Sequence, residues 1–86
     1  MFQISFRPSF IKQMNKLEKN LIDEVFYKIE LLKKSPSHPE LKTHKLHGKL
    51  KGMWGFSVNY KIRIIFKYEF KKEISLLVIG DHNTYN

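Results

Sequence analysis

The sequence predicts an α+β domain in which a small, mainly antiparallel sheet carries a helical hairpin on one face. Residues 2–6 alternate apolar and polar side chains, as a half-buried strand does. Residues 8–34 then repeat apolar side chains at helical spacing. The remaining chain returns to short apolar segments separated by polar turns, which is typical of strands. The predicted element order is therefore β-α-α-β-β-β.

A single domain spanning residues 1–86 is expected, because so short a chain cannot divide its apolar residues between two cores. Hydrophobic residues make up 42% of the chain, which favours a packed interior over disorder. The sequence contains no cysteine, which excludes disulfides and cysteine–zinc sites and fits the reducing cytoplasm. No apolar segment approaches the length of a bilayer span. We therefore expect a cytoplasmic protein with no membrane partner.

The helical region has recognisable start and stop signals. Pro8 suits a first helical turn, because its missing N–H costs nothing there. We expect a break near Asn20 and a second helix over residues 22–34, which the proline-containing segment 35–39 ends. The apolar residues of the first helix recur at helical spacing: Phe10, Met14, Leu17 and Leu21.

The second half of the chain is expected to form a loop and three strands. Residues 40–51 are predicted to be irregular, because Gly48 within them and Gly52 directly after them allow backbone turns that other residues resist. Residues 53–59 and 61–68 are predicted strands joined by a tight turn. A second turn at 69–72 leads into the apolar run 74–79, which is typical of a central strand buried on both faces.

Positive charge is concentrated in one part of the sequence. The net charge is +8, and the segment from Lys33 to Lys67 carries all of it, with nine Lys or Arg and one acid, Glu40. Such localised charge favours an anionic partner. Basic and aromatic residues interleave there, as on surfaces where lysines contact a nucleic-acid backbone and rings stack on bases. The candidates for RNA contact are Lys42, Lys45, His47, Lys49, Lys51, Trp54 and Lys61.

These candidates can also be explained without any RNA contact. Loop lysines are usually only solvated, and a strand residue such as Trp54 is usually buried in the core. His44 and His47 are three residues apart, but the neighbouring lysines repel a cation and no further ligands accompany them. We therefore expect neither a metal site nor a cofactor.

A few polar residues have the chemistry to cleave RNA. Attack by the 2′-hydroxyl of RNA needs a base, an acid and a cation beside the phosphorus. His44 or His47, together with His82, Tyr85 and Arg63, can fill these roles. The alternatives are solvated loop histidines, a tyrosine that anchors the chain end, and an arginine paired with an acid such as Asp81.

Three segments carry a resemblance to a known family. LHGKLKGMW at 46–54, YKIRIIF at 60–66 and IGDHNTY at 79–85 resemble the RelE/ParE toxin superfamily of type II toxin–antitoxin systems. Within it, the chain is most similar to RelE- and YafQ-like messenger-RNA endonucleases. The resemblance implies a RelE-like fold and a toxin that enters the ribosomal A site, cuts messenger RNA without metal and so inhibits translation. It also implies a cognate antitoxin protein that binds and inhibits the toxin.

The resemblance implies roles for individual residues. Arg63 matches the arginine of the family that contacts the scissile phosphate, and His44 matches a loop histidine of the YafQ-like branch. His82 matches the C-terminal histidine of that branch, and Tyr85 the terminal tyrosine of the RelE branch. The implied catalytic set is therefore His44, Arg63, His82 and Tyr85.

The match is incomplete, and residues 52–59 lack the lysine pair of the RelE branch. Ser57 stands about where the YafQ-like branch has another histidine, and Val78 where it has an arginine. The identities of the general acid and base therefore stay open. Two other functions also stay open: a ParE-like inhibitor of DNA gyrase that cleaves nothing, and a basic nucleic-acid-binding module whose binding depends strongly on salt.

Overall fold

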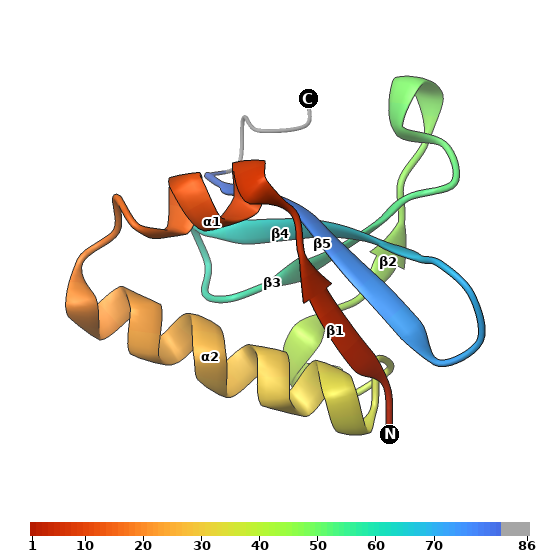
Figure 1. Ribbon diagram of the computed structural model, residues 1–86, viewed down its shortest axis with the longest axis horizontal. Helices are drawn as coiled ribbons and strands as arrows, with labels where there is room; N and C mark the ends of the chain where they lie inside the picture. Colours follow the sequence, from red (N-terminus) through yellow and green to blue (C-terminus); the bar gives the residue numbers. More distant parts are fainter. Residues whose placement is uncertain (82–86) are drawn as a thin grey trace.

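The computed structural model describes residues 1–81, and two of the catalytic candidates, His82 and Tyr85, lie outside the described residues. Its elements are β1 (Gln3–Phe6), α1 (Pro8–Met14), α2 (Lys19–Lys34), η1 (Pro39–Leu41), β2 (His44–Lys45), η2 (Gly48–Leu50), β3 (Trp54–Ser57), β4 (Arg63–Tyr68) and β5 (Glu73–Gly80). η1 and η2 are short 3-10 helices. The predicted α+β class is confirmed, with helices packed on a sheet (Figure 1).

The five strands form one sheet in the order β1-β5-β4-β3-β2 (Figure 1). β1 pairs with β5 in parallel, and the other neighbouring strands are antiparallel. β5 therefore lies between two strands, as its apolar sequence predicts. A register shift separates the pairs Ile65–Val78 and Phe66–Leu76, so that Leu77 is an extra residue on β5.

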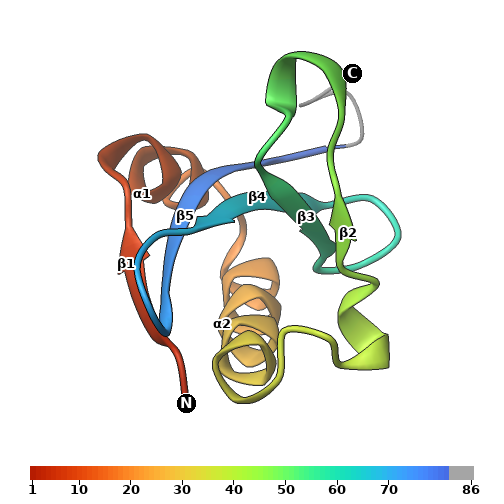
Figure 2. The ribbon, with the colours of Figure 1, turned by 90° about the vertical axis from the view of Figure 1, so that its right-hand side faces the viewer.

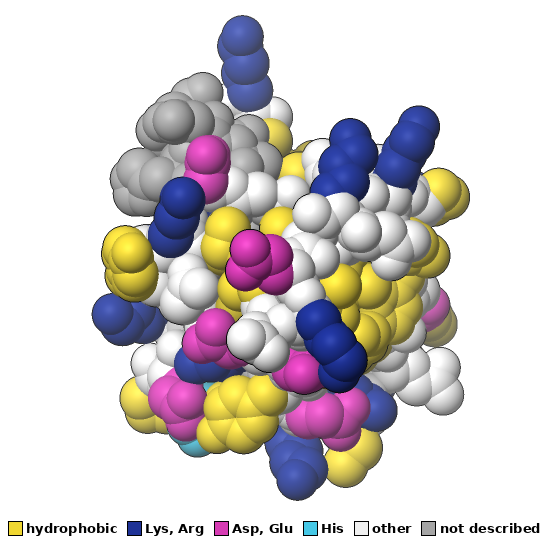
Figure 3. Space-filling model, turned by 90° about the vertical axis from the view of Figure 1, so that its left-hand side faces the viewer, with side chains coloured by type: hydrophobic (Ala, Val, Ile, Leu, Met, Phe, Trp, Pro, Cys, Tyr) yellow, Lys and Arg dark blue, Asp and Glu magenta, His cyan; other side chains and the backbone are white. Residues whose placement is uncertain are grey.

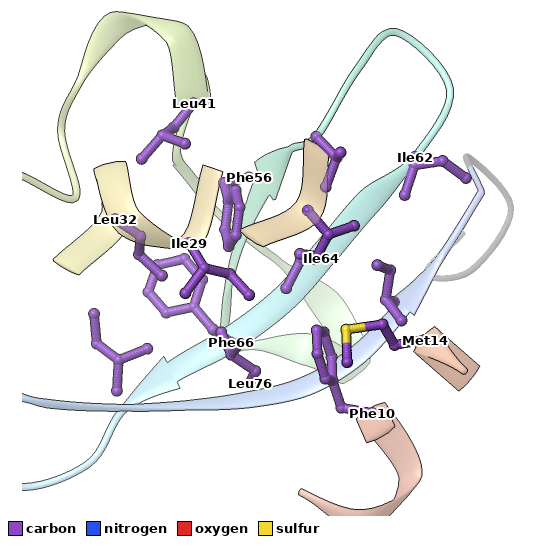
Figure 4. Close-up of a cluster of buried hydrophobic side chains, with 14 residues drawn as sticks. Phe10, Met14, Ile29, Leu32, Leu41, Phe56, Ile62, Ile64, Phe66 and Leu76 are labelled. Carbon is purple, nitrogen blue, oxygen red and sulfur yellow. The ribbon is translucent and has the colours of Figure 1, made fainter. Parts of the chain in front are cut away.

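One face of the sheet and both helices share a single core. α2 lies on one side of the sheet, and η2 projects on the opposite side (Figures 1 and 2). The core side chains of α1, α2, η1 and the strands point toward one another in Figure 4. The labelled members are Phe10, Met14, Ile29, Leu32, Leu41, Phe56, Ile62, Ile64, Phe66 and Leu76.

α1 also protects the part of the β5 edge that β1 leaves unpaired. β1 pairs with β5 only as far as the pair Phe6–Leu76. Beyond it, the Ser9 hydroxyl donates to the Leu77 carbonyl at 3.0 Å, and the Ile79 N–H donates to Oε1 of Gln13 at 3.0 Å. Side chains of α1 therefore satisfy backbone groups that would otherwise form an open sheet edge.

The predicted break near Asn20 is wrong by several residues. α1 ends at Met14, and Asn20 lies inside α2. The backbone leaves the helical region at Glu18, whose φ of -65° and ψ of 152° are extended. Helix α2 can therefore begin at Lys19, and the weak helix preference of Asn20 does not prevent it.

The predicted loop at 40–51 contains a short edge strand, β2, which pairs with β3. The strands predicted at 53–59 and 61–68 are shorter than expected, because residues 58–62 form their connection. Oδ1 of Asn59 accepts hydrogen bonds from the N–H groups of Lys61 and Ile62 at 2.8 and 2.7 Å. Sequence alternation alone does not reveal such a side-chain-stabilised turn.

Neither α1 nor α2 has the length and hydropathy of a membrane-spanning helix, and the rest of residues 1–81 contains no other candidate.

Hydrogen bonds join β1, β5 and the β4–β5 turn on the other face of the sheet. The Ser75 hydroxyl donates to Oε2 of Glu69 at 2.6 Å, and Oγ of Ser75 lies 2.9 Å from Oγ of Ser5. Nη2 of Arg7 lies 3.1 Å from the same Glu69 oxygen. The Ser75 hydroxyl, followed by Arg7, lowers the pKa of the Glu69 carboxyl below its usual 4.5.

Replacing Phe66 by alanine should destabilise the fold strongly, because its ring is fully buried between the sheet and the helices. We expect the free energy of unfolding to fall by about 3–5 kcal/mol, measured by urea denaturation. Phe70→Ala is the matched control, since Phe70 is 74% exposed and should change stability by less than about 0.5 kcal/mol. Similar losses in both variants would contradict this description of the core.

Glu69→Gln should reduce stability in a pH-dependent way. The folded-state pKa of Glu69 is lowered, so its ionised form stabilises the fold above pH 4.5, and this stabilisation is lost as pH falls through the lower pKa. The difference in unfolding free energy between wild type and Glu69→Gln should therefore be larger at pH 7 than at pH 3. Glu18→Gln serves as the control, because Glu18 makes no side-chain hydrogen bond or ion pair within residues 1–81. A pH-independent difference for Glu69→Gln would contradict the network.

Candidate functional site

Strand alternation places several polar candidates on the sheet face opposite the helices. His44 pairs with Gly55, and Ser57 pairs with Arg63. Cross-strand partners point to the same side of a sheet, and Phe56 between Gly55 and Ser57 points into the helix-side core. The 3-10 helix η2 projects from the opposite surface, but no α-helix covers it, and we call it the helix-free face; its residues on β2, β3 and β4 are His44, Gly55, Ser57, Arg63, Ile65 and Lys67.

His44 is an exposed side chain held from two sides. Its Nδ1 lies 3.0 Å from the carbonyl oxygen of Lys42. Its Cε1 and Nε2 lie 3.5 and 3.6 Å from the point that a Cβ atom on Gly55 would occupy. The glycine therefore leaves room for the imidazole to lie over the neighbouring strand.

Arg63 is half-buried at the start of β4. Its Nη1 donates to the carbonyl oxygens of Asn59 at 2.7 Å and Ile62 at 3.4 Å, so one corner of the guanidinium is fixed to the β3–β4 turn. Within residues 1–81, no ion pair joins Arg63 to an acid, and Nε and Nη2 donate no hydrogen bond. Among the described residues, Nε and Nη2 are therefore left to donate to an anion.

His44 and Arg63 lie on the same face of the sheet. They are two strands apart and offset by two residues along the sheet, which places their Cα atoms roughly 12 Å from each other. The Arg63 guanidinium bonds to carbonyls of the β3–β4 turn, at the end of the β3–β4 pair away from His44. Lys67 lies on the same face, two positions beyond Ile65, and the sequence reasoning did not select it. The period-two alternation from Arg63 along β4 is the signal that identifies it.

A second group of candidates surrounds a separate hollow of about 360 Å³ at the β2–β3 edge. Lys45, His47, Lys51 and Trp54 all line this hollow. Nζ of Lys45 lies 5.6 Å from the centroid of the Trp54 ring, a cation–π distance. Trp54 also packs edge-on against Tyr68 with 5.4 Å between ring centroids. The structure therefore brings these four RNA-contact candidates together, with Trp54 half-buried.

The other candidates are dispersed. Lys42, Lys49 and Lys61 are exposed and lie in separate segments: before β2, in η2 and in the β3–β4 turn. Among residues 1–81, no three His, Asp or Glu side chains come together as a possible metal site.

Acidic residues pair with some of these basic side chains, and Nζ of Lys67 lies 3.8 Å from Oε1 of Glu69. The single acid of the basic segment, Glu40, is paired with Lys28 at 3.1 Å. The hydrogen bond from Lys28 lowers the pKa of the Glu40 carboxyl. Three further acids, Asp23, Glu24 and Glu30, belong to α2 on the other side of the sheet. Figure 3 shows one side of the molecule, where most Asp and Glu side chains lie in the middle and lower part, and Lys and Arg side chains lie at the top, at the margins and among the acids.

The size of the side chain at position 55 should affect the position of the His44 ring. Gly55→Ala places a methyl group at ordinary contact distance from the His44 ring, so stability should change by less than about 1 kcal/mol. Gly55→Leu cannot be accommodated without moving the ring or the Leu46 side chain, and should cost about 1–3 kcal/mol. Urea denaturation and the NMR shifts of the His44 ring measure these effects. An unchanged His44 ring in Gly55→Leu would contradict the described contact.

Comparison with protein-family models finds no match, and neither does a search of curated protein sequences. Comparison with solved structures does find matches. A copper-bound mutant toxin from Helicobacter pylori is 24% identical, and the match covers 100% of both chains with a TM-score of 0.70. YafQ from E. coli is 21% identical over 96% of each chain, with a TM-score of 0.79.

A chain of the archaeal RelE–RelB complex from Pyrococcus horikoshii is 17% identical, with a TM-score of 0.78 over 96% of this chain and 97% of that chain. YoeB and ParE toxins match in the same way. These similarities concern the backbone and span nearly the whole chain. The resemblance predicted from the sequence is thereby confirmed at the level of the fold: the chain has the fold shared by RelE-, YoeB-, YafQ- and ParE-like toxins.

Proposed function

We propose that this protein is the toxin of a type II toxin–antitoxin system and acts as a metal-independent, ribosome-dependent messenger-RNA endonuclease. The observation that carries the proposal is the helix-free face, where His44 and Arg63 lie on neighbouring parts of one sheet surface. The Arg63 guanidinium has no acidic partner within residues 1–81. An imidazole and an unneutralised guanidinium are suited to phosphodiester chemistry.

In the proposed reaction, the RNA supplies its own nucleophile. The 2′-hydroxyl loses a proton to a base and attacks the adjacent phosphorus, while the 5′-oxygen takes up a proton and leaves. The products are a 2′,3′-cyclic phosphate and a 5′-hydroxyl end. Arg63 is proposed to bind the phosphate oxygens, and His44 to transfer a proton. His82 and Tyr85 remain proposed members of the same catalytic set.

The proposed RNA contacts extend beyond the helix-free face. The hollow lined by Lys45, His47, Lys51 and Trp54 offers three basic side chains and one aromatic ring, the combination that binds single-stranded nucleic acid. Lys42, Lys49 and Lys61 are proposed to contact the backbone of the message or of ribosomal RNA at the A site. Because translation takes place in the cytoplasm, that is the proposed location.

An antitoxin protein is the second proposed partner. Several structures with this fold are complexes named as toxin–antitoxin pairs, including a YoeB–YefM complex from Staphylococcus aureus. The net charge of +8 favours an acidic partner segment that covers the basic surface.

Induced expression of the wild-type chain should arrest bacterial growth, and mapping of messenger 5′ ends should reveal new cleavage sites. Arg63→Ala should reduce cleavage on the order of 100-fold or more, because it removes the cation beside the phosphate. His44→Ala should reduce it on the order of 10-fold to 100-fold. Lys19→Ala is the matched control, since this exposed lysine lies on α2 and should leave cleavage unchanged.

Two results would contradict the proposal. Full cleavage in both Arg63→Ala and His44→Ala would remove the helix-free face from the mechanism. Growth arrest with a DNA-damage response and no new messenger ends would favour inhibition of DNA gyrase. Folding of the variants is checked by circular dichroism, because Arg63 also bonds to the β3–β4 turn.

A further inference from the structure

The segment before β2 fixes which nitrogen of His44 carries its proton. A carbonyl oxygen accepts hydrogen bonds and cannot donate them. The 3.0 Å contact between Nδ1 of His44 and the Lys42 carbonyl therefore requires the hydrogen on Nδ1. In the neutral ring, Nε2 then has the lone pair, and this nitrogen lies over Gly55 on the helix-free face.

An uncommon backbone conformation places that carbonyl. Lys42 has a φ of 51° and a ψ of 43°, in the left-handed region that residues with a Cβ atom rarely adopt. It follows η1 directly, and its N–H donates to the Pro39 carbonyl at 3.3 Å. In an ordinary right-handed or extended conformation, the Lys42 carbonyl would point in another direction, and the bond to His44 would be lost.

Contacts on both sides hold this conformation in place. Leu41 is completely buried in the core. The hydroxyl of Thr43 donates to the Pro36 carbonyl at 2.6 Å. After the histidine, Leu46 is buried and its N–H donates to the Met53 carbonyl at 3.0 Å. The geometry around His44 is therefore determined by the fold before any ligand binds.

We propose that Lys42 is a positioning residue: its left-handed backbone and main-chain carbonyl hold His44 in the Nδ1–H tautomer, with Nε2 ready to accept a proton on the helix-free face. The side chain of Lys42 is not required for this role. The catalytic consequence rests on the proposed endonuclease function, whereas the tautomer itself does not.

The protein contains an internal control. Nδ1 of His38 accepts a hydrogen bond from the Glu40 N–H at 3.1 Å, so its hydrogen must be on Nε2 when the ring is neutral. The two histidines are thus expected to have opposite tautomers within one molecule. Free histidine in water prefers the Nε2–H form, so His44 should be the exception.

Ring-nitrogen NMR of the full chain at about pH 8.5, where an ordinary histidine ring is neutral, tests the proposal. His44→Gln and His38→Gln identify the two sets of signals. We expect a protonated Nδ1 in His44 and a protonated Nε2 in His38. An Nε2–H form of His44 in the wild type would overturn the proposal.

Two variants separate the effect of the Lys42 backbone conformation from the effect of its side-chain charge. Lys42→Gly removes the lysine charge but readily adopts the left-handed conformation, so the Nδ1–H tautomer should persist. Lys42→Val removes the same charge and strongly disfavours that conformation, so His44 should shift toward Nε2–H. Retention of Nδ1–H in Lys42→Val, or its loss in Lys42→Gly, would overturn the role of the Lys42 backbone. Amide spectra confirm that both variants are folded.

RNA cleavage by the same variants tests the catalytic consequence. Lys42→Val should lose on the order of tenfold or more relative to Lys42→Gly, because the wrong tautomer presents a hydrogen where a lone pair is needed. Equal cleavage by the two variants, despite different tautomers, would overturn that consequence. If the wild type cleaves no RNA, the proposed function fails, and the NMR result still decides how His44 is held.

Discussion

The burial of one sheet face against α2 is the constraint on which the rest of the molecule depends. Alternate residues of β3, β4 and β5 enter that core, including Phe56, Ile64 and Leu76. Because side chains alternate across a strand, their neighbours must point to the other face. Core formation therefore determines, without further interactions, that Ser57 and Arg63 both lie on the helix-free face, where Ser57 is buried and Arg63 half-buried.

The same alternation separates the basic candidates into two groups. His44 and Lys45 are adjacent in sequence, yet they point to opposite sides of β2. His44 joins Arg63, whereas Lys45 lies beside the Trp54 ring. A nucleic-acid strand that contacts both groups has to pass around the β2–β3 edge of the sheet. Strand β2 has only two residues, yet it places one member of each basic group on its own side of the sheet.

Much of the fold follows from local patterns in the sequence. The alternation at β1, the helical spacing through Leu32 and the apolar run of β5 each indicate their element correctly. The break between the helices and the length of β3 were predicted less well, because they depend on main-chain bonds and on the Asn59 side chain. Strand β2 has only two residues, too few for any period to be visible.

Part of the candidate site was also predictable from the sequence. Residue chemistry and the family resemblance point to Arg63 and His44, and alternation places Arg63 opposite Ser57. The environment of each side chain is not encoded locally. The bond from Arg63 to the Asn59 carbonyl and the bond from His44 to the Lys42 carbonyl require the folded turns. Lys67 was missed because its charge resembles that of any surface lysine until β4 is paired.

The parallel pairing of β1 with β5 has a consequence for synthesis of the chain. Ser5 bonds to Ser75, 70 residues later, so the first strand to leave the ribosome must wait for the last one. Contacts of such long sequence separation form late and slow folding. Until β5 emerges, β1 has no neighbour in the sheet, and its exposed apolar residues depend on α2 for cover. The nascent chain therefore acquires its complete sheet only after residues 73–80 have emerged.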